Sequence, residues 1–294
     1  MTQDCTRYEK DTAVGKLKVV DRGRKRTLYL NGLPQTTIDT SDLSSTAADY
    51  IAYLHIGTLL CPEIENIGML GLGGGAAVHS FHANYPEAKI TAVDIDPDVV
   101  EVAKKHFFLN KYKNIDLVVD DARNFLMHRK DTFDFVILDV YDGEGYPDRL
   151  YTREAFNLIS QALKSSDVYE QPVSALAVNV VGNLRGQNPR SRTVRTVIKT
   201  VKDVFPAVYL FAVQQSFWKR LFGRGNNYIL LAHRRKKTLT DECLRSRAEL
   251  RNQKAELNVD LSRMLKGRRS IPPLDEVQVL TDRAVRSHRR ILSI

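Results

Sequence analysis

The stretch "IGMLGLGGGAA" (67–77) passes from a short apolar run into a glycine-rich turn. An apolar strand followed by such a turn is typical of the first unit of a nucleotide-binding α/β domain, because glycine lets the backbone turn tightly and approach a ligand closely. The residues from Gly71 to Ala76 fit the pattern G-x-G-x-x-A of dinucleotide-binding proteins. That motif alone is weak evidence, so the segments that follow it have to decide the fold.

Apolar runs and helical stretches alternate on the carboxyl side of this turn. The runs are "KITAVDID" (89–96), "IDLVVDDA" (115–122), "FDFVILDV" (133–140) and "SALAVNVV" (174–181). Their valines, isoleucines and leucines follow one another without polar alternation, which indicates parallel strands covered on both faces. The order predicts an α/β fold with a doubly wound, mostly parallel, Rossmann-like sheet, closed by a pair of strands at 208–213 and 227–232.

The chain divides into three regions by pattern. We expect an N-terminal region (1–60), a Rossmann-like nucleotide-binding catalytic domain (61–233) and a basic helical tail (234–294). In the first region, apolar runs at 17–20 and 27–30 flank a polar turn and predict a small β-hairpin, and "SDLSSTAADYIAYLHIGTLL" (41–60) predicts a helix. The tail has leucines on a helical stripe that could pack on the domain or bind a partner. They are Leu244, Leu250, Leu257, Leu261 and Leu265.

Composition excludes several classes of protein. The chain has 294 residues, of which 43% are hydrophobic, enough for a sizeable core. No apolar run reaches the roughly 18 residues of a membrane span, and the N-terminus lacks the pattern of a secretory signal. We therefore expect a soluble, cytoplasmic protein that does not bind a membrane. The three cysteines are scattered, and His79 and His82 lack a third ligand, so we expect no metal site.

Positive charge is concentrated in the tail. Residues 233–294 carry sixteen lysines and arginines against eight acids, and so supply +8 of the net charge of +9. Such a tail could attract acidic protein or RNA. Its interleaved acids and its lack of stacking aromatic residues also fit an ordinary solvated face.

Acidic residues follow the second and third predicted strands, and ligands of open parallel sheets bind beyond such strand ends. Asp94, about twenty residues past the glycines, is placed to accept hydrogen bonds from both hydroxyls of a ribose. Asp96, just before Pro97, is the better helix cap. Asp121 either accepts a hydrogen bond from an adenine amino group or caps the next helix, and both interpretations stay open.

More acids crowd the end of the fourth strand, in "DFVILDVYDGEGYP". A dehydrogenase needs none of them, whereas a transferase with a sulfonium nucleotide as donor can use a carboxylate that takes a proton from an attacking amine. Asp139 is the candidate base, because burial at the end of an apolar run raises the pKa of a carboxyl. Asp142 would orient the amine. The alternative is an acidic solvated loop balanced by Arg149 and Arg153.

The segment from Gly71 to Phe156 resembles the spermidine synthase family of polyamine aminopropyltransferases, which have the class I methyltransferase fold. It is most similar to the shorter, spermidine synthase-like members. The resemblance rests on "GLGGGAAV", "AVDIDPDVVEVAKKHF", "DDARNFL" and "DFVILDVYDGEGYPDRLYTREAF". Weaker similarity, in "LYLNGLPQ" and "GNNYILLA", extends it to about residues 17–232.

This resemblance implies a site for decarboxylated S-adenosylmethionine. The residues implied to hold its nucleoside are Gln35, Gly71, Gly73, Gly74, Gly75, Asp94, Asp121 and Ala122. Asp139 and Asp142 match the D-x-x-D pair, with the first as the base. Ala76 departs from the family, because it stands where an acid grips the aminopropyl amine. The Tyr-His-Glu signature of the gating helix is also missing, and Tyr50 and Tyr53 are the nearest matches.

Three hypotheses follow. The first is an aminopropyltransferase-like enzyme, dimeric as the resemblance implies, that alkylates a small-molecule amine or polyamine. The second is a methyltransferase that uses intact S-adenosylmethionine on a protein amine, since Ala76 relieves repulsion with that donor's carboxylate. The third is a catalytically silent nucleotide-binding relative whose tail recruits nucleic acid. Trp218 is expected to anchor a loop or a subunit contact.

Overall fold

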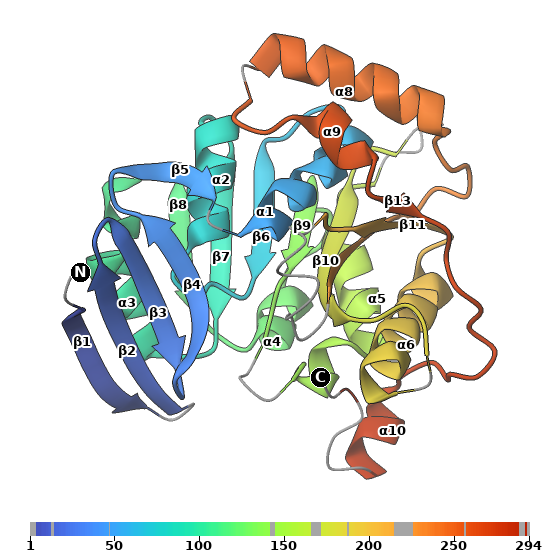
Figure 1. Cartoon of the computed structure of the whole chain (residues 1–294). Helices are drawn as coiled ribbons and strands as arrows, with labels where there is room; N and C mark the ends of the chain where they lie inside the picture. Colours follow the sequence, from blue (N-terminus) through green and yellow to red (C-terminus); the bar gives the residue numbers. More distant parts are fainter. Residues whose placement is uncertain are drawn as a thin grey trace.

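Two β-sheets form the protein, and the larger one lies at its centre (Figure 1). The computed structural model describes residues 4–12, 15–46, 48–141, 145–165, 172–186, 188–214, 226–255, 257–287 and 292. The larger sheet has eight strands in the order β13-β11-β12-β10-β9-β6-β7-β8. They are β6 (Asn66–Leu70), β7 (Lys89–Asp94), β8 (Ile115–Val119), β9 (Phe135–Leu138), β10 (Ala175–Gly182), β11 (Ala207–Ala212), β12 (Asn226–His233) and β13 (Arg268–Arg269).

The predicted doubly wound sheet and its closing pair of strands are confirmed. Strands β6 to β10 run parallel, whereas β12 is antiparallel to both β10 and β11. Because β12 runs the opposite way, it begins at the edge of the sheet where β10 ends. Asn227 of β12 therefore pairs with Val181 of β10.

Helices cover both faces of this sheet (Figure 1). One face carries α1 (Asp49–Leu54), the 3₁₀ helix η1 (His55–Leu60), α2 (Ala76–Asn84), α3 (Pro97–His106), η2 (Leu109–Lys111), α8 (Asp241–Ala255) and α9 (Leu261–Leu265). The other carries α4 (Ala122–Met127), η3 (Asp148–Leu150), α5 (Arg153–Ala162), α6 (Pro189–Val204) and α10 (Asp282–Ser287). All of β9 is buried, with Phe135 and Ile137 in the first core and Val136 and Leu138 in the second. Two covered faces explain why its sequence shows no polar alternation.

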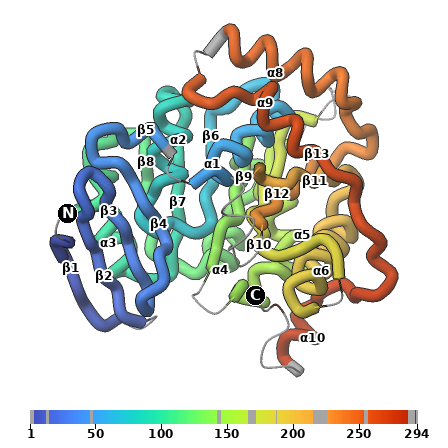
Figure 2. The backbone as a smooth tube through the Cα atoms, in the orientation of Figure 1, coloured from blue at the N-terminus to red at the C-terminus, as the bar shows by residue number. Residues whose placement is uncertain are grey.

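The smaller sheet is antiparallel and packs beside α3 (Figure 2). Its strands are β1 (Cys5–Thr12), β2 (Gly15–Arg22), β3 (Lys25–Leu30), β4 (Leu33–Asp39) and β5 (Asp42–Thr46). The expected hairpin is β2–β3, two of five strands. Leu17, Val19 and Leu28 of this hairpin pack against Val99 and Val102 of α3.

The predicted helix at 41–60 is wrong in its first part, where β5 forms instead. Asp42 Oδ1 accepts hydrogen bonds from the backbone N–H groups of Ser44 and Ser45 at 3.1 and 3.3 Å. Serine and aspartate compete in this way for backbone partners, which disfavours a helix. Helix begins only at Asp49.

The tail packs on the domain and does not form one helical stripe. Leu244 of α8 and Leu261 of α9 are buried, but Leu250 is 55% exposed. Asp260 caps a separate helix α9 by accepting from the N–H of Arg263 across 3.0 Å. Beyond β13 the chain passes along the outside of α6 to α10 (Figure 2). In the described parts of the chain, no helix has the length and apolar character needed to cross a membrane.

Candidate active site

A cavity of about 470 Å³ lies at the carboxyl ends of the parallel strands, between the two sheets. This is the position at which open α/β sheets bind ligands. Of the predicted site residues, those in its lining are Gln35, Gly71, Gly73, Asp94, Asp121, Ala122 and Asp139. Gly74 and Gly75 belong to the same turn but lie outside the lining. Apolar side chains, including Ile95 and Ile137, complete the wall.

The glycine turn brings three elements close together. Gly71 has a φ of +96°, and a Cβ at this position would overlap the carbonyl oxygen of Asp139. Gly75 has a φ of +76° and directly precedes α2. The N–H of Gly74 donates to Thr36 Oγ1 of β4 across 2.9 Å. A left-handed backbone and such close approach both require glycine.

Asp94 ends β7 at the wall of the cavity. Its Oδ2 accepts from the N–H of Leu72 and its Oδ1 from the N–H of Asp96, each across 3.1 Å. Burial raises the pKa of this carboxyl, and the backbone donors oppose the shift. Since each carboxylate oxygen can accept a further hydrogen bond, Asp94 can still receive two neighbouring hydroxyls. Asp96 caps α3 as predicted, by accepting from the N–H of Asp98 across 2.8 Å.

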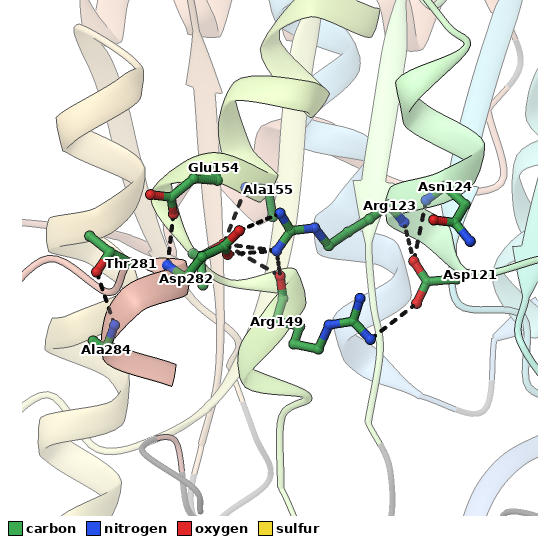
Figure 3. A network of polar contacts seen from close by, with 10 residues as sticks. Asp121, Arg123, Asn124, Arg149, Glu154, Ala155, Thr281, Asp282 and Ala284 are labelled. Atoms are coloured by element: carbon green, nitrogen blue, oxygen red, sulfur yellow. Dashed lines mark hydrogen bonds and ion pairs between the residues drawn. The ribbon is translucent and has the colours of Figure 1, made fainter. Parts of the chain in front are cut away.

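Asp121 caps α4, which agrees with one of its two interpretations. Its Oδ1 accepts from the N–H groups of Arg123 and Asn124 at 2.8 and 3.2 Å. Its Oδ2 lies 4.0 Å from the Arg149 guanidinium (Figure 3). Because Asp121 and Ala122 also line the cavity, the cap leaves room for a contact with adenine, which stays a prediction.

A polar network behind Asp121 connects the C-terminal helix to this wall (Figure 3). Asp282 of α10 accepts hydrogen bonds from both terminal nitrogens of Arg123, at 2.6 and 2.7 Å. Arg123 also donates to the backbone carbonyl of Arg149 across 3.0 Å, and Thr152 donates to Asp282 across 2.8 Å. The Arg123 guanidinium is the main cause of the lowered pKa of Asp282. Helix α10 thus supports the backbone that carries Arg149 to the rim of the cavity.

Asp139 follows β9 and holds two hydrogen-bond donors at its carboxylate. Oδ2 accepts from the Tyr50 hydroxyl across 2.8 Å, and Oδ1 accepts from Asn179 Nδ2 across 2.9 Å. Asn179 Oδ1 in turn accepts from Asn227 Nδ2 across 2.9 Å. Burial raises the pKa of Asp139, and its two donors oppose that shift. The result is a fixed carboxylate that binds a proton more readily than one in water.

The sequence leaves Tyr50 and Tyr53 undecided, and the structure separates them. Tyr50 contacts Asp139, whereas the Tyr53 hydroxyl accepts from the N–H of Gln214 across 3.2 Å. Asn179 and Asn227 are missed by the sequence reasoning. A lone amide inside the apolar run "SALAVNVV" is the available signal, because a buried polar group needs a partner.

Some predictions lie outside the described residues. Asp142 and Trp218 are among them, so their expected roles stay predictions. Within the described residues, no group of three or more histidines, cysteines, aspartates or glutamates could hold a metal ion. Both ring nitrogens of His79 form hydrogen bonds of 2.7 Å, Nδ1 with the Tyr112 hydroxyl and Nε2 with the backbone carbonyl of Phe107. Burial lowers the pKa of His79 to about 4.

Ala76 begins α2 and lines the cavity. The first turn of α2 contains no acidic residue. Helix α2 therefore places no carboxylate at the position where the resemblance implies an acid that binds the aminopropyl amine.

The strand order and the cavity define an α/β protein of the class I methyltransferase type. Residues 50–179 match the family model of the spermine/spermidine synthase domain. The match covers 130 of the 294 residues, so this part of the chain is similar to that family's domain.

Relatives of two kinds share this region. The chain is 30% identical over 175 residues to the polyamine aminopropyltransferase of Vibrio vulnificus, which covers 58% of this chain and 54% of that protein. It is 33% identical over 186 residues to the eEF1A lysine and N-terminal methyltransferase homolog of Drosophila pseudoobscura pseudoobscura. That alignment covers 59% of this chain and 26% of that protein. The chain thus spans about half of the first relative and a quarter of the second.

Solved structures agree on the fold. Spermidine synthase from Thermotoga maritima superposes with a TM-score of 0.67 over 91% of this chain and 84% of that chain, at 15% identity. Human Methyltransferase-like protein 13 in complex with SAH superposes with a TM-score of 0.51 over 76% and 91%, at 20% identity. At these identities the likeness shows the architecture alone.

Proposed function

We propose that the protein is a transferase that binds decarboxylated S-adenosylmethionine and transfers its aminopropyl group to an amine. The observation that supports this most strongly is the position of Asp139 in the same cavity as the glycine turn and Asp94. The named activity of the Vibrio vulnificus relative points the same way.

The nucleoside would be held by the strand ends. Asp94 would accept hydrogen bonds from the two ribose hydroxyls, and Asp121 with Ala122 would meet the edge of the adenine. Gln35, from the smaller sheet, would contact the same nucleoside. Ile95, 61% exposed beside Asp94, offers an apolar surface for the adenine ring.

Asp139 would act as the general base. The acceptor ammonium gives a proton to Asp139, and the freed lone pair attacks the carbon bonded to the sulfonium sulfur. The new C–N bond forms as the C–S bond breaks, and its electron pair leaves with sulfur in a neutral thioether. Tyr50 and Asn179 hold the carboxylate in place during the transfer.

Methyl transfer from intact S-adenosylmethionine to a protein amine is the second candidate. Ala76 favours it, because no acid there would repel the carboxylate of that donor. The same base and the same nucleoside contacts would serve both reactions. A catalytically silent nucleotide-binding relative is the third.

Calorimetric titration with both donors and with the thioether 5′-methylthioadenosine separates these functions. Tighter binding of the decarboxylated donor supports aminopropyl transfer, and tighter binding of the intact donor supports methyl transfer. Asp139→Asn should keep nucleoside affinity and lose most transfer activity, whereas the exposed Asp116→Asn should change neither. Unchanged turnover in Asp139→Asn would remove Asp139 from the role of base, and binding of none of the three compounds would reject the proposal.

A further inference from the structure

A second, larger cavity lies beside the candidate active site. Its volume is about 1710 Å³, and it lies between α6 and residues 269–276 of the tail. Figures 1 and 2 show this part of the tail passing along α6. The charged residues of its lining are Arg185, Arg190, Arg195, Arg269, Asp275 and Glu276.

This lining has an excess of positive charge. It holds four arginines against one aspartate and one glutamate, and Arg195 pairs with Glu276 across 3.0 Å. Within the described residues, neither Arg185 nor Arg269 forms an ion pair with a carboxylate. Guanidinium groups without such partners bind carboxylate or phosphate oxygens and repel cations.

The two cavities meet at the edge of the large sheet. Val181 and Asn227 line the cavity of the candidate active site and form one cross-strand pair. The next pair along the same two strands is Gly182 with Asn226, and Asn226 lines the arginine cavity. Asn227 also holds Asn179, the partner of Asp139, through a 2.9 Å hydrogen bond. A ligand in the arginine cavity can therefore extend over this edge towards Asp139.

A neutral polar group in the lining also lacks a partner. The Oδ1 atom of Asn226 is buried and accepts no hydrogen bond within the described residues. A buried amide oxygen without a donor is costly, and a ligand N–H would remove that cost. Backbone N–H groups of a polypeptide supply such a donor at every residue except proline.

We propose that the arginine cavity binds an acidic polypeptide segment, so that the amine alkylated at Asp139 belongs to a polypeptide with carboxylates near that amine. This inference rests on the proposed alkylation of an amine and names its substrate class. Free polyamines fit poorly, because Arg185 and Arg269, which form no ion pair with a carboxylate of the described residues, repel them. The volume also exceeds the range of about 300–1,000 Å³ that is usual for small-molecule sites. RNA fits less well, because the amino groups of its bases are neutral, whereas the proposed base removes a proton from an ammonium group.

Fluorescence anisotropy on the full chain tests the proposal. The probes are a labelled peptide with one lysine flanked by glutamates, the same peptide with glutamines, inorganic phosphate as a competitor, and labelled oligouridylate. The variants are Arg185→Gln with Arg269→Gln in one chain, and the control Arg192→Gln, an exposed α6 residue outside the lining. Titration with 5′-methylthioadenosine follows the nucleoside site separately.

We expect the acidic peptide to bind at least roughly tenfold more tightly than the glutamine peptide, and to lose that advantage in the double variant alone. Mass spectrometry should then show alkylation of its lysine. Equal affinity for both peptides, equal loss in Arg192→Gln, displacement of the peptide by equimolar phosphate, or tighter binding of oligouridylate would each overturn the proposal. Retained 5′-methylthioadenosine binding in those cases would leave the proposed transferase standing.

Discussion

The hydroxyl of Tyr50 donates a hydrogen bond to Oδ2 of Asp139 across 2.8 Å, although the two residues lie 89 positions apart. Burial, followed by the negative charge of Asp139, raises the pKa of Tyr50 well above its ordinary value. The hydroxyl therefore keeps its proton at neutral pH and remains a donor. Helix α1, which precedes the large sheet in the chain, thus orients the candidate base at the end of β9.

Tyr50→Phe should shift the pH profile of transfer. The Tyr50 hydroxyl lowers the pKa of Asp139 against the effect of burial, so its loss should raise that pKa further. Since the base has to be ionised before it accepts a proton, the acidic limb of the rate profile should move to higher pH. Measurement of kcat against pH checks this, with Tyr53→Phe on the same helix as control. Superimposable profiles of Tyr50→Phe and wild type would contradict the assigned contact.

Gly71→Ala should destabilise the fold far more than Gly23→Ala. Both glycines have positive φ, +96° and +60°, but an added Cβ meets nothing within 4 Å at Gly23 and the Asp139 backbone at Gly71. Strain alone should lower the free energy of unfolding by roughly 1 kcal/mol in Gly23→Ala. Strain and overlap together should cost roughly 2–5 kcal/mol in Gly71→Ala. Denaturant unfolding measures both, and equal losses would show that the close approach is unimportant.

Asp282→Asn should lower stability at neutral pH and have little effect in acid. Arg123 is the main cause of the lowered pKa of Asp282, so the folded state binds a proton there less readily than the unfolded chain. Its contribution is therefore present above the ordinary pKa of 3.8 and is lost as the pH falls through the lowered value. Thermal unfolding of wild type and variant should differ at pH 7 and converge at low pH.

The exposed pair of Asp116 with Lys89 provides the matched control, because both of its side chains are more than half exposed. Asp116→Asn should change the melting temperature little at any pH. A pH-independent difference for Asp282→Asn would show that the ion pair with Arg123 is not what stabilises α10.

The fold could be predicted from the sequence where the pattern was continuous. Strands such as β9 are buried on both faces, so every residue is apolar and the continuous apolar run predicts a strand. The serines of β5 carry no such pattern, and strand formation there depends on pairing with β4, which the local sequence does not reveal. The separation of α8 from α9 was missed for a related reason, since leucine spacing alone does not distinguish the buried Leu244 from the exposed Leu250.

The candidate site could be predicted only in part. Acids at strand ends are visible in the sequence because strand ends align at one edge of a parallel sheet. Tyr50 of α1 contacts Asp139, and Asn227 of the antiparallel strand β12 contacts Asn179, the second donor to Asp139. The sequence does not reveal contacts between residues so far apart in the chain. The sequence considers Arg149 only in the alternative of an acidic solvated loop, and that alternative is not tested by the described residues. Its contacts with Arg123, through the backbone carbonyl, and with Asp121, through the guanidinium at 4.0 Å, were not predicted.

Asp139→Asn should make the protein more stable at neutral pH while it loses transfer activity. Burial raises the pKa of Asp139 above its ordinary value of 3.8, so the folded state binds a proton there more readily than the unfolded chain. The free energy of unfolding therefore falls as the pH rises through the raised pKa and stays lower above it. Asparagine carries no charge and avoids this loss. The variant's melting temperature should exceed that of wild type by roughly 2–4 °C for each kcal/mol gained at neutral pH, and the gain should shrink below the ordinary pKa. Calorimetry between pH 3.5 and 8 measures the difference in melting temperature, with the exposed Asp275→Asn as control. A variant less stable than wild type at neutral pH would show that the hydrogen bonds from Tyr50 and Asn179 outweigh the desolvation of the carboxylate.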